Sequence, residues 1–467
     1  MSEQFVFWDG SGKISSALLY EFLGKMGFGK FYPLGNDIKN SDPIIVRVQG
    51  NVVSEVKFGY ILEIVRQHIL ICKCESGEIE SILESLHRNI ALLGSKNLML
   101  LSKLDLEFIT DSRYSAFFFF RNGIVEITAE SISIKDYDDY DQYIWERDIK
   151  DSDYIRQDFN DLIDFEYVMF LLDLCRVESD EHSNLRFDAL RSAIGYLLHR
   201  YKDGLSNKAI ILMDVFVNGN PNGGSGKSLL INSIGKIRKV APIDGKKYDQ
   251  REWFALSSAG LNTEIILFDD AKKDFNFEGL FALMTEGLML KRKYRDDIFI
   301  PHKDAPKVAI TTNYAIIGNS SSFKRRMYEF EVSSTYSAYF SPRDKFGRNF
   351  FDDWNEYDWN IFYNVMFNCL QYYLRHGLIE SEPINIGLTK LTNQTNEDFV
   401  EWAEEYLQTN GQLDKKDLYE SFTGLYSEHR LVKQRVFTDW LRIWGDYKNY
   451  NVQEGHSGNV RHITFAD

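Results

Sequence analysis

The stretch Gly219-Asn-Pro-Asn-Gly-Gly-Ser-Gly-Lys-Ser228 follows an apolar run at 208–214 and precedes the apolar residues 229–231. A strand, a glycine-rich loop and a helix in this order are typical of a phosphate-binding loop. The glycines let backbone N–H groups turn inward, and the helix N-terminus adds partial positive charge. We therefore expect Lys227 to reach the β- and γ-phosphates of ATP and Ser228 to bind Mg²⁺. The expected nucleotide contacts are Gly219, Asn222, Gly223, Gly224, Ser225, Gly226, Lys227, Ser228 and Leu229.

The loop departs from the usual pattern at one position. The pattern Gly-x-x-x-x-Gly-Lys-Ser/Thr requires glycine at position 221, where this chain has Pro221. Because four other glycines lie in the loop, we expect it to be slightly longer or differently bent. The alternative, a glycine-rich loop without function, is disfavoured by the flanking strand and helix.

A pair of carboxylates ends the next apolar strand. Ile265-Ile-Leu-Phe-Asp-Asp270 has four apolar residues followed by two acids. On a strand next to the phosphate-loop strand, these carboxylates would reach the Mg²⁺ and the attacking water. We assign Asp269 to Mg²⁺ coordination and Asp270 to orienting or activating the nucleophile.

A third strand, Lys307-Val-Ala-Ile-Thr-Thr-Asn313, ends in an amide that could hydrogen-bond both the γ-phosphate and the lytic water. It is followed by Phe323-Lys-Arg-Arg-Met-Tyr-Glu-Phe330, in which two arginines lead into a strand. A guanidinium offered to a neighbouring subunit's γ-phosphate is an arginine finger. The spacing favours Arg326 over Arg325 for this role, and a surface basic pair is the alternative.

Between the carboxylates and Asn313 lies Gly287-Leu-Met-Leu-Lys-Arg-Lys-Tyr-Arg-Asp-Asp-Ile-Phe-Ile-Pro301, which predicts a hairpin with a basic tip at 293–295. In a ring, such a hairpin would project into the central channel. Lys291, Lys293 and Arg295 could then bind nucleic-acid phosphates, with Lys303 as a weaker candidate. A merely solvated hairpin is the alternative.

These motifs together resemble those of superfamily-3 helicases. The loop at 220–228 and Thr312-Asn-Tyr314 are closer to phage and plasmid replication helicases, including primase-helicases related to the poxvirus type. Ala193-Ile-Gly-Tyr-Leu-Leu-His199 and Phe119-Phe-Arg-Asn-Gly-Ile-Val-Glu126 agree with this resemblance, which covers about residues 115–335. It implies an AAA+-like P-loop ATPase core, a hexameric ring and translocation on single-stranded DNA, usually 3′ to 5′. The departure at Pro221 leaves the shape of the loop open.

The N-terminal sequence carries less chemistry. A helical stretch at 15–26 and a strand at 44–49 predict a mixed α+β region. Phe117 to Phe120, an Asn-Gly turn and a second apolar run predict a hairpin. Four consecutive phenylalanines favour a strand buried on both faces over a base-stacking platform. We find neither a zinc-binding cysteine set nor a strand-framed Asp-x-Asp pair, so we expect no primase site.

The C-terminal residues 397–467 predict three helices followed by two strands around Glu454-Gly-His-Ser-Gly458. This order suggests a winged-helix-like domain whose third helix enters a DNA groove. Lys433, Arg435, Arg442, Lys448 and Arg461 would then face phosphates. Protein docking is the alternative, because Glu401, Glu404 and Glu405 keep this region far from basic.

Composition bounds these interpretations. The 467 residues carry a net charge of -15, but residues 126–181 alone hold 18 acids and 5 bases, whereas residues 286–326 hold 9 bases and 4 acids. The acidity is therefore local and does not exclude nucleic acid. Four cysteines make no disulfide framework. No apolar run is long enough to span a membrane and no signal peptide is recognisable, so we expect a cytoplasmic protein, in a bacterial host if phage-encoded.

The fold class expected is α/β: a P-loop NTPase core with an α+β N-terminal region and a winged-helix-like C-terminal domain. The expected boundaries are 1–110, 111–200 (hairpin and acidic helical collar), 201–340 (ATPase core), 341–395 (helical connector) and 396–467. The function expected is an ATP-dependent replicative DNA helicase that binds ATP, Mg²⁺ and single-stranded DNA as a homo-oligomer, with a separate primase or origin DNA as further partners. The alternatives are a primase-helicase, an ATP-switched origin-binding or loader protein, and an RNA-directed viral helicase.

Overall fold

The computed structural model describes residues 5–33, 42–72, 76–204, 207–217, 220–221, 223–252, 254–291, 297–316, 318, 320–407, 409, 411–458 and 460–466. The chain divides into two compact units. The first consists of residues 1–111, 116–127 and 132–155, and the second of 112–115, 128–131 and 156–467. The hairpin with the four phenylalanines thus groups with the N-terminal residues. The boundaries expected at 110, 200, 340 and 395 stay predictions.

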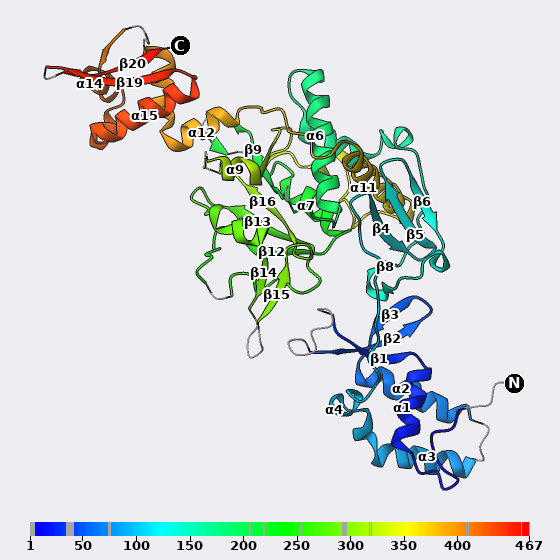
Figure 1. Cartoon of the computed structure of the whole chain (residues 1–467). Helices are drawn as coiled ribbons and strands as arrows, with labels where there is room; N and C mark the ends of the chain where they lie inside the picture. Colours follow the sequence, from blue (N-terminus) through cyan, green and yellow to red (C-terminus); the bar gives the residue numbers. More distant parts are fainter. Residues whose placement is uncertain are drawn as a thin grey trace. The chain divides into compact units, whose positions relative to one another are not determined.

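The first unit contains helices and two small sheets (Figure 1). One sheet has the strand order β1-β2-β3-β7 and the other β6-β5-β4-β8. The elements are α1 (Ser16–Lys25), β1 (Phe28–Phe31), β2 (Ile44–Gln49), β3 (Val52–Glu55), α2 (Phe58–Leu70), α3 (Ser76–Arg88), α4 (Ser95–Leu98), β4 (Ser115–Phe120), β5 (Gly123–Thr128), β6 (Ile132–Lys135), β7 (Ile144–Trp145) and β8 (Ile149–Lys150). The predicted helix at 15–26, strand at 44–49 and Asn-Gly hairpin are all present.

The four phenylalanines are not buried on both faces of β4, as the sequence had suggested. Phe118 and Phe120 are buried, whereas Phe117 and Phe119 are only half-buried. Successive side chains of a strand point to opposite faces. Only one face of β4 therefore lies fully in the core, and the other is partly open.

The second unit is built on a parallel sheet with the strand order β12-β13-β16-β9-β17. The sheet strands are β9 (Ala209–Asp214), β12 (Val240–Asp244), β13 (Ile265–Ala271), β16 (Lys307–Thr312) and β17 (Met327–Val332). The helices before the C-terminal region are α5 (Glu166–Cys175), α6 (Asp180–Leu198), α7 (Lys227–Gly235), α8 (Phe281–Thr285), α9 (Ser321–Arg326), α10 (Pro342–Phe346) and α11 (Glu356–His376). Every residue of β9 and β16 is buried, as expected for central strands of a parallel sheet.

The sequence placed the carboxylate strand directly beside the phosphate-loop strand, and this was wrong. β16 lies between β9 and β13, because β13 pairs with β16 and β16 pairs with β9. Order along the chain does not fix order in a sheet. Asn313 therefore follows the strand that pairs with β9, whereas the carboxylates lie on the next strand, β13.

The predicted basic hairpin is present as β14 (Gly287–Leu290) paired antiparallel with β15 (Ile298–Pro301). Leu288, Leu290 and Ile300 are buried, while Met289 and Phe299 are half exposed. The tip at 292–296 lies outside the described residues.

The C-terminal region has its own apolar core, which includes Phe399, Trp402, Phe422, Phe437 and Leu441. Its elements are α12 (Ile386–Gln394), α13 (Glu397–Tyr406), β18 (Leu413–Asp414), α14 (Lys415–Leu425), α15 (Gln434–Tyr447), β19 (Asn451–Ser457) and β20 (Val460–Ala466). The strands pair antiparallel in the order β18-β20-β19. The three helices and the hairpin after them are therefore where the sequence predicted them.

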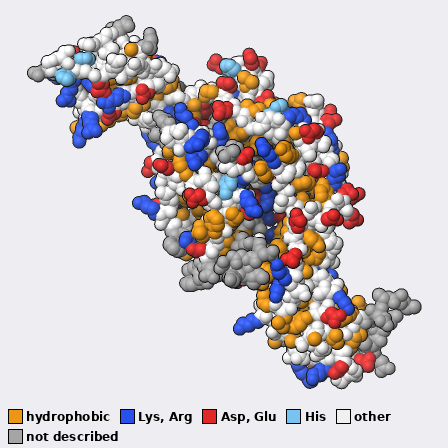
Figure 2. All heavy atoms as spheres, in the orientation of Figure 1, with side chains coloured by type: hydrophobic (Ala, Val, Ile, Leu, Met, Phe, Trp, Pro, Cys, Tyr) orange, Lys and Arg blue, Asp and Glu red, His pale blue; other side chains and the backbone are white. Residues whose placement is uncertain are grey.

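Within the described parts of the chain, no helix has both the length and the apolar character needed to cross a membrane. On the face that Figure 2 displays, acidic and basic side chains are interspersed.

Candidate nucleotide site

The glycine-rich loop joins β9 to the N-terminus of α7. Gly224 and Gly226 have φ of +86° and +100°, which residues with a Cβ adopt only under strain. Pro221 belongs to β11 (Asn220–Pro221), which pairs with β10 (Phe216–Val217). The position where the usual pattern has glycine is thus part of a short antiparallel pair that precedes the tight turn. Gly219 and Asn222 lie outside the described residues.

Both glycines also lie close to neighbouring chain segments. A Cβ on Gly224 would lie 2.9 Å from the carbonyl carbon of Ser337, and one on Gly226 would lie 3.0 Å from the side chains of Phe170 and Leu174. Glycine is therefore required here by packing as well as by conformation. The loop is fixed between helix α5 and the segment that follows β17.

Lys227 is buried at the start of α7, and its amine contacts three side chains. It forms an ion pair with Asp214 and donates to Asn313 Oδ1 at 3.1 Å and to Ser225 Oγ at 3.2 Å. Burial lowers the pKa of Lys227, and the carboxylates of Asp214 and Asp270 oppose that effect. The amine thus lies among groups that a phosphate could replace.

Asp214 is the residue of this site that sequence reasoning missed. It ends β9, is almost fully buried, and accepts hydrogen bonds from both Lys227 and Ser225. Its second oxygen, Oδ2, is buried and has no hydrogen-bond partner among the described residues. The available signal was a carboxylate at the end of an otherwise apolar strand that leads into a glycine-rich loop.

The two predicted carboxylates lie in different surroundings. Asp269 Oδ1 accepts from Thr311 Oγ1 at 2.5 Å. Asp270 has a φ of +55°, and its N–H donates to the same hydroxyl at 2.8 Å. The β13–β16 register shifts at this point, which turns Asp270 out of the regular ladder. Its carboxylate pairs with Lys246, and this hydrogen bond raises the pKa of Lys246.

The loop, Lys227 and the two carboxylates Asp269 and Asp270 line one cavity of about 480 Å³. A volume of this size is in the range of small-molecule sites, and several polar side chains converge on it. The cavity is lined by Gly223, Gly224, Ser225, Gly226, Lys227, Ser228, Leu229, Asp269, Asp270, Thr311, Thr312, Asn313 and Pro342. The structure thus brings together every described residue that the sequence assigned to nucleotide and metal binding.

A second cavity, of about 700 Å³, adjoins the first because Leu229 and Pro342 line both. Its walls include the apolar side chains of Phe350 and Phe351 and the polar side chains of Arg343 and Asn349. Residues of α7 and β12 also line it.

Neither predicted arginine lines the phosphate-side cavity of its own chain. Arg326 is half-buried: its guanidinium lies 4.5 Å from the centre of the Phe281 ring and donates to the Ser322 carbonyl at 3.2 Å. Arg325 is exposed, and its Nε donates to the Ser321 carbonyl at 3.3 Å. Arg325 is therefore the more accessible of the two, whereas the spacing had favoured Arg326.

The candidate DNA contacts are only partly described. Lys291 pairs with Asp297 at 2.6 Å, next to the tip of the β14–β15 hairpin, where β14 ends and β15 begins. Lys303 is exposed just after β15. Lys293 and Arg295 lie outside the described residues.

No protein-family model matches the sequence, and no curated protein matches it. Solved structures similar to this chain include the following three. An apo form of the NrS-1 C-terminal region is 14% identical over 96% of this chain and 98% of that chain, with a TM-score of 0.42. The active SCCmec type IV Cch helicase is 11% identical over 94% and 92%, with a TM-score of 0.32. JCV helicase is 14% identical over 57% and 70%, with a TM-score of 0.25. At TM-scores below one half, these likenesses carry no conclusion about this chain.

Proposed function

We propose that this chain is an ATP-dependent replicative DNA helicase of the superfamily-3 type that works as a homo-oligomeric ring on single-stranded DNA. The observation that carries the proposal is the convergence of Lys227, Asp269 and Asn313 on one cavity at the N-terminus of α7. A buried amine, a helix N-terminus and a carboxylate pair are the groups that bind and hydrolyse a nucleoside triphosphate.

The donor set fits ATP and Mg²⁺. Ser228 and Asp269 offer the hydroxyl and carboxylate oxygens that Mg²⁺ prefers, and both line the cavity. A bound Mg²⁺ would neutralise charge on the phosphates. Lys227 would bind the β- and γ-phosphates, Asp270 would orient the attacking water, and Asn313 would hold the γ-phosphate and that water.

Lys227 forms an ion pair with Asp214. A phosphate that enters the cavity offers the amine a second anion, and Asp214 keeps the chain of Lys227 in place during the exchange. The adjoining cavity, whose walls are partly apolar, is suited to the base and ribose, because its aromatic and aliphatic side chains would cover a flat ring.

The DNA would lie along the β14–β15 hairpin, with Lys291, Lys293 and Arg295 on its phosphates and Lys303 beside them. Arg325 or Arg326 would reach the nucleotide of a neighbouring subunit in a hexamer. The C-terminal order of three helices and a terminal hairpin supports a winged-helix-like domain. There, however, Arg442 pairs with Glu454 and Lys448 with Glu404. A DNA surface on this domain would thus rest more on Lys433, Arg435 and Arg461.

The test is steady-state ATP hydrolysis with and without single-stranded DNA. Wild type is compared with Lys227→Ala, with the hairpin variant Lys293→Ala/Arg295→Ala, and with Lys57→Ala/Lys96→Ala as a matched control of two exposed lysines in the first unit. We expect DNA to stimulate wild type and the control, Lys227→Ala to be inactive, and the hairpin variant to keep basal hydrolysis without stimulation.

Other outcomes identify the alternatives. If the assembled protein binds specific duplex DNA and DNA does not stimulate its ATP hydrolysis, the protein is an origin-binding or loader protein and not a helicase. Stimulation by RNA alone would indicate an RNA helicase, and primer synthesis from ribonucleotides a primase-helicase.

A further inference from the structure

The segment after β17, residues 333–346, forms part of the wall of the candidate nucleotide site. The backbone of Ser337 and Ala338 lies against Gly224 of the phosphate loop. Pro342, at the start of α10, lines both cavities. We call residues 333–346 the covering segment. Its position sets the space open to a ligand above the loop.

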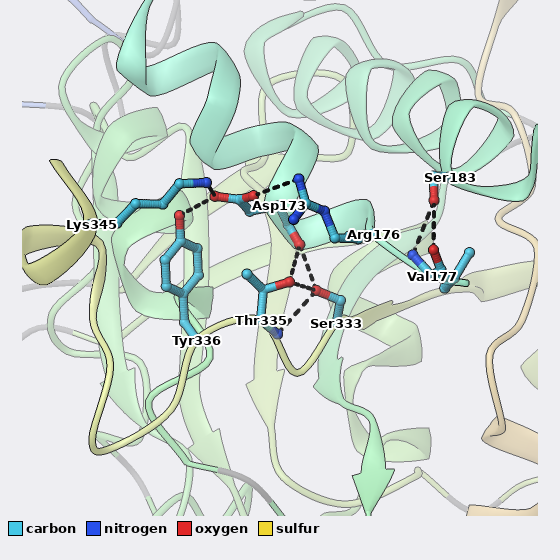
Figure 3. Close-up of polar contacts among 8 residues, drawn as sticks. All are labelled: Asp173, Arg176, Val177, Ser183, Ser333, Thr335, Tyr336 and Lys345. Atoms are coloured by element: carbon cyan, nitrogen blue, oxygen red, sulfur yellow. Dashed lines mark hydrogen bonds and ion pairs between the residues drawn. The ribbon is translucent and has the colours of Figure 1, made fainter. Parts of the chain in front are cut away.

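One buried carboxylate holds the covering segment at both ends. Asp173, on α5, is 1% exposed, and its Oδ2 accepts from Tyr336 Oη and from Lys345 Nζ, each at 2.5 Å (Figure 3). Arg176 adds a third positive or polar group, with its guanidinium 3.6 Å from Asp173 Oδ1. In the sequence, Tyr336 precedes and Lys345 follows the residues that touch the site, which are Ser337, Ala338 and Pro342. Asp173 therefore binds the covering segment on both sides of these residues.

The backbone of the same residue adds two more bonds. The Asp173 carbonyl accepts from Ser333 Oγ at 2.5 Å and from Thr335 Oγ1 at 3.0 Å (Figure 3). Burial and the hydrogen bond to Asp173 raise the pKa of Tyr336, so its hydroxyl stays a donor at neutral pH.

Helix α5 also contacts the phosphate loop directly. Phe170 and Leu174, on the turn around Asp173, pack against Gly226, and the rings of Phe170 and Tyr336 are 5.9 Å apart. One helix therefore sets the position of the loop from one side and that of the covering segment from the other.

We propose that Asp173 is a positioning residue of the nucleotide site, although it contacts neither cavity. The inference rests on the proposed function. A buried carboxylate is stable only while its donors stay in place, so the ionised Asp173 fixes Tyr336 and Lys345, and with them the wall at 337–342. Loss of the charge loosens that wall and weakens nucleotide binding more than it slows the chemical step.

The test compares Asp173→Asn with Glu331→Gln. Glu331 is an equally buried carboxylate that accepts from the N–H groups of Ile384 and Asn385, away from both cavities. For Asp173→Asn we expect KM for ATP and Kd for ADP to rise about 10-fold, with kcat within about 2-fold of wild type. For Glu331→Gln we expect a lower Tm with unchanged KM and Kd. If the role of Asp173 were purely structural, Asp173→Asn would also lower Tm and leave KM and Kd unchanged.

A second variant covers the case in which Asp173→Asn does not fold. Tyr336→Phe/Lys345→Met removes both donors and is expected to raise Kd for ADP about 3- to 10-fold. If wild type binds and hydrolyses ATP but both sets of variants keep its Kd and KM, the inference is overturned and the proposed function stands. If wild type itself binds no ATP or ADP, the proposed function fails and the inference fails with it.

Discussion

A lysine is buried at each of the two edges of the parallel sheet, the carboxyl edge and the amino edge of its strands. The surroundings of these two lysines differ. At the carboxyl edge, Lys227 contacts Asp214, Asn313 and Ser225 beside a cavity. At the amino edge, Lys307 donates to the backbone carbonyls of Tyr196 and His199, at the end of α6, and its amine lies 3.9 Å from the Tyr196 ring centre.

Burial alone therefore does not distinguish a lysine beside a cavity from a lysine that only caps the end of a helix. The partners of Lys307 are backbone carbonyls at the end of α6, and the helix fixes their positions. We therefore expect no ligand to replace them as partners of the amine. Two of the partners of Lys227, Ser225 and Asn313, line a cavity, where a phosphate could compete with them. In parallel sheets the loops that form such sites follow the carboxyl ends of strands.

The largest effect is expected for Lys227→Ala. Removal of a cation that stabilises transferring phosphate should lower ATP hydrolysis by about 100- to 1000-fold. The variant also leaves Asp214 buried and unpaired, so activity is measured per folded molecule, with circular dichroism as the check. A hydrolysis rate within 3-fold of that of wild type would show that Lys227 does not take part in ATP hydrolysis.

Lys307→Met is expected to lower stability and to leave ATP hydrolysis unchanged. The free energy of unfolding should fall by about 2 to 3 kcal/mol, because carbonyls at the end of α6 lose a charged donor. Hydrolysis per folded molecule should stay near that of wild type. Urea unfolding measures the stability, and ATPase assays on the same samples measure the activity. A loss of activity as large as that of Lys227→Ala would contradict the distinction between the two lysines.

A pH effect is expected from Lys202, which also lies at the amino edge and donates to the carbonyls of Ala305 and Pro306. Burial lowers the pKa of Lys202 to about 8, while Asp304 opposes the shift. The folded protein therefore loses this proton between pH 8 and 10.5, where the unfolded chain still keeps it.

The free energy of unfolding should consequently rise with pH in that window. Relative to Lys202→Met, wild type is expected to gain about 2 kcal/mol between pH 7 and pH 9.5. Denaturant unfolding of both proteins at the two pH values measures the difference. A constant difference would show that Lys202 titrates alike in both states.

The smallest effect is expected for Lys246→Ala at the carboxyl edge. Lys246 is exposed and pairs with Asp270, and exposed ion pairs contribute little. We expect hydrolysis to change by about a factor of 2 to 5, measured under saturating ATP. A loss as large as that of Lys227→Ala would make Lys246 a direct ligand of the nucleotide.

Much of the candidate site could be predicted from the sequence. Lys227 and Ser228 belong to a short motif in which local geometry and chemistry coincide, so their place at a helix N-terminus followed from residue order. Asp269, Asp270 and Asn313 end apolar strands, and strand ends meet at one edge of a parallel sheet. Asp214 was missed because a single acid at a strand end has no distinctive spacing.

The strand order could not be predicted, because the sequence does not specify which of the four other strands of the sheet lie beside β9. The role of Asp173 was equally hidden. It contacts Tyr336 and Lys345, which follow it by 163 and 172 residues. No local pattern links residues so far apart.

The sequence by itself determined the glycine-rich loop before α7, the carboxylate pair and the polar strand end, because short-range spacing specifies loops and strand termini. Only the tertiary structure decided that β16 lies between β9 and β13, that Asp214 holds Lys227, and that α5 fixes the covering segment over the loop. Those features depend on which buried surfaces pack together, and packing is settled by the whole chain.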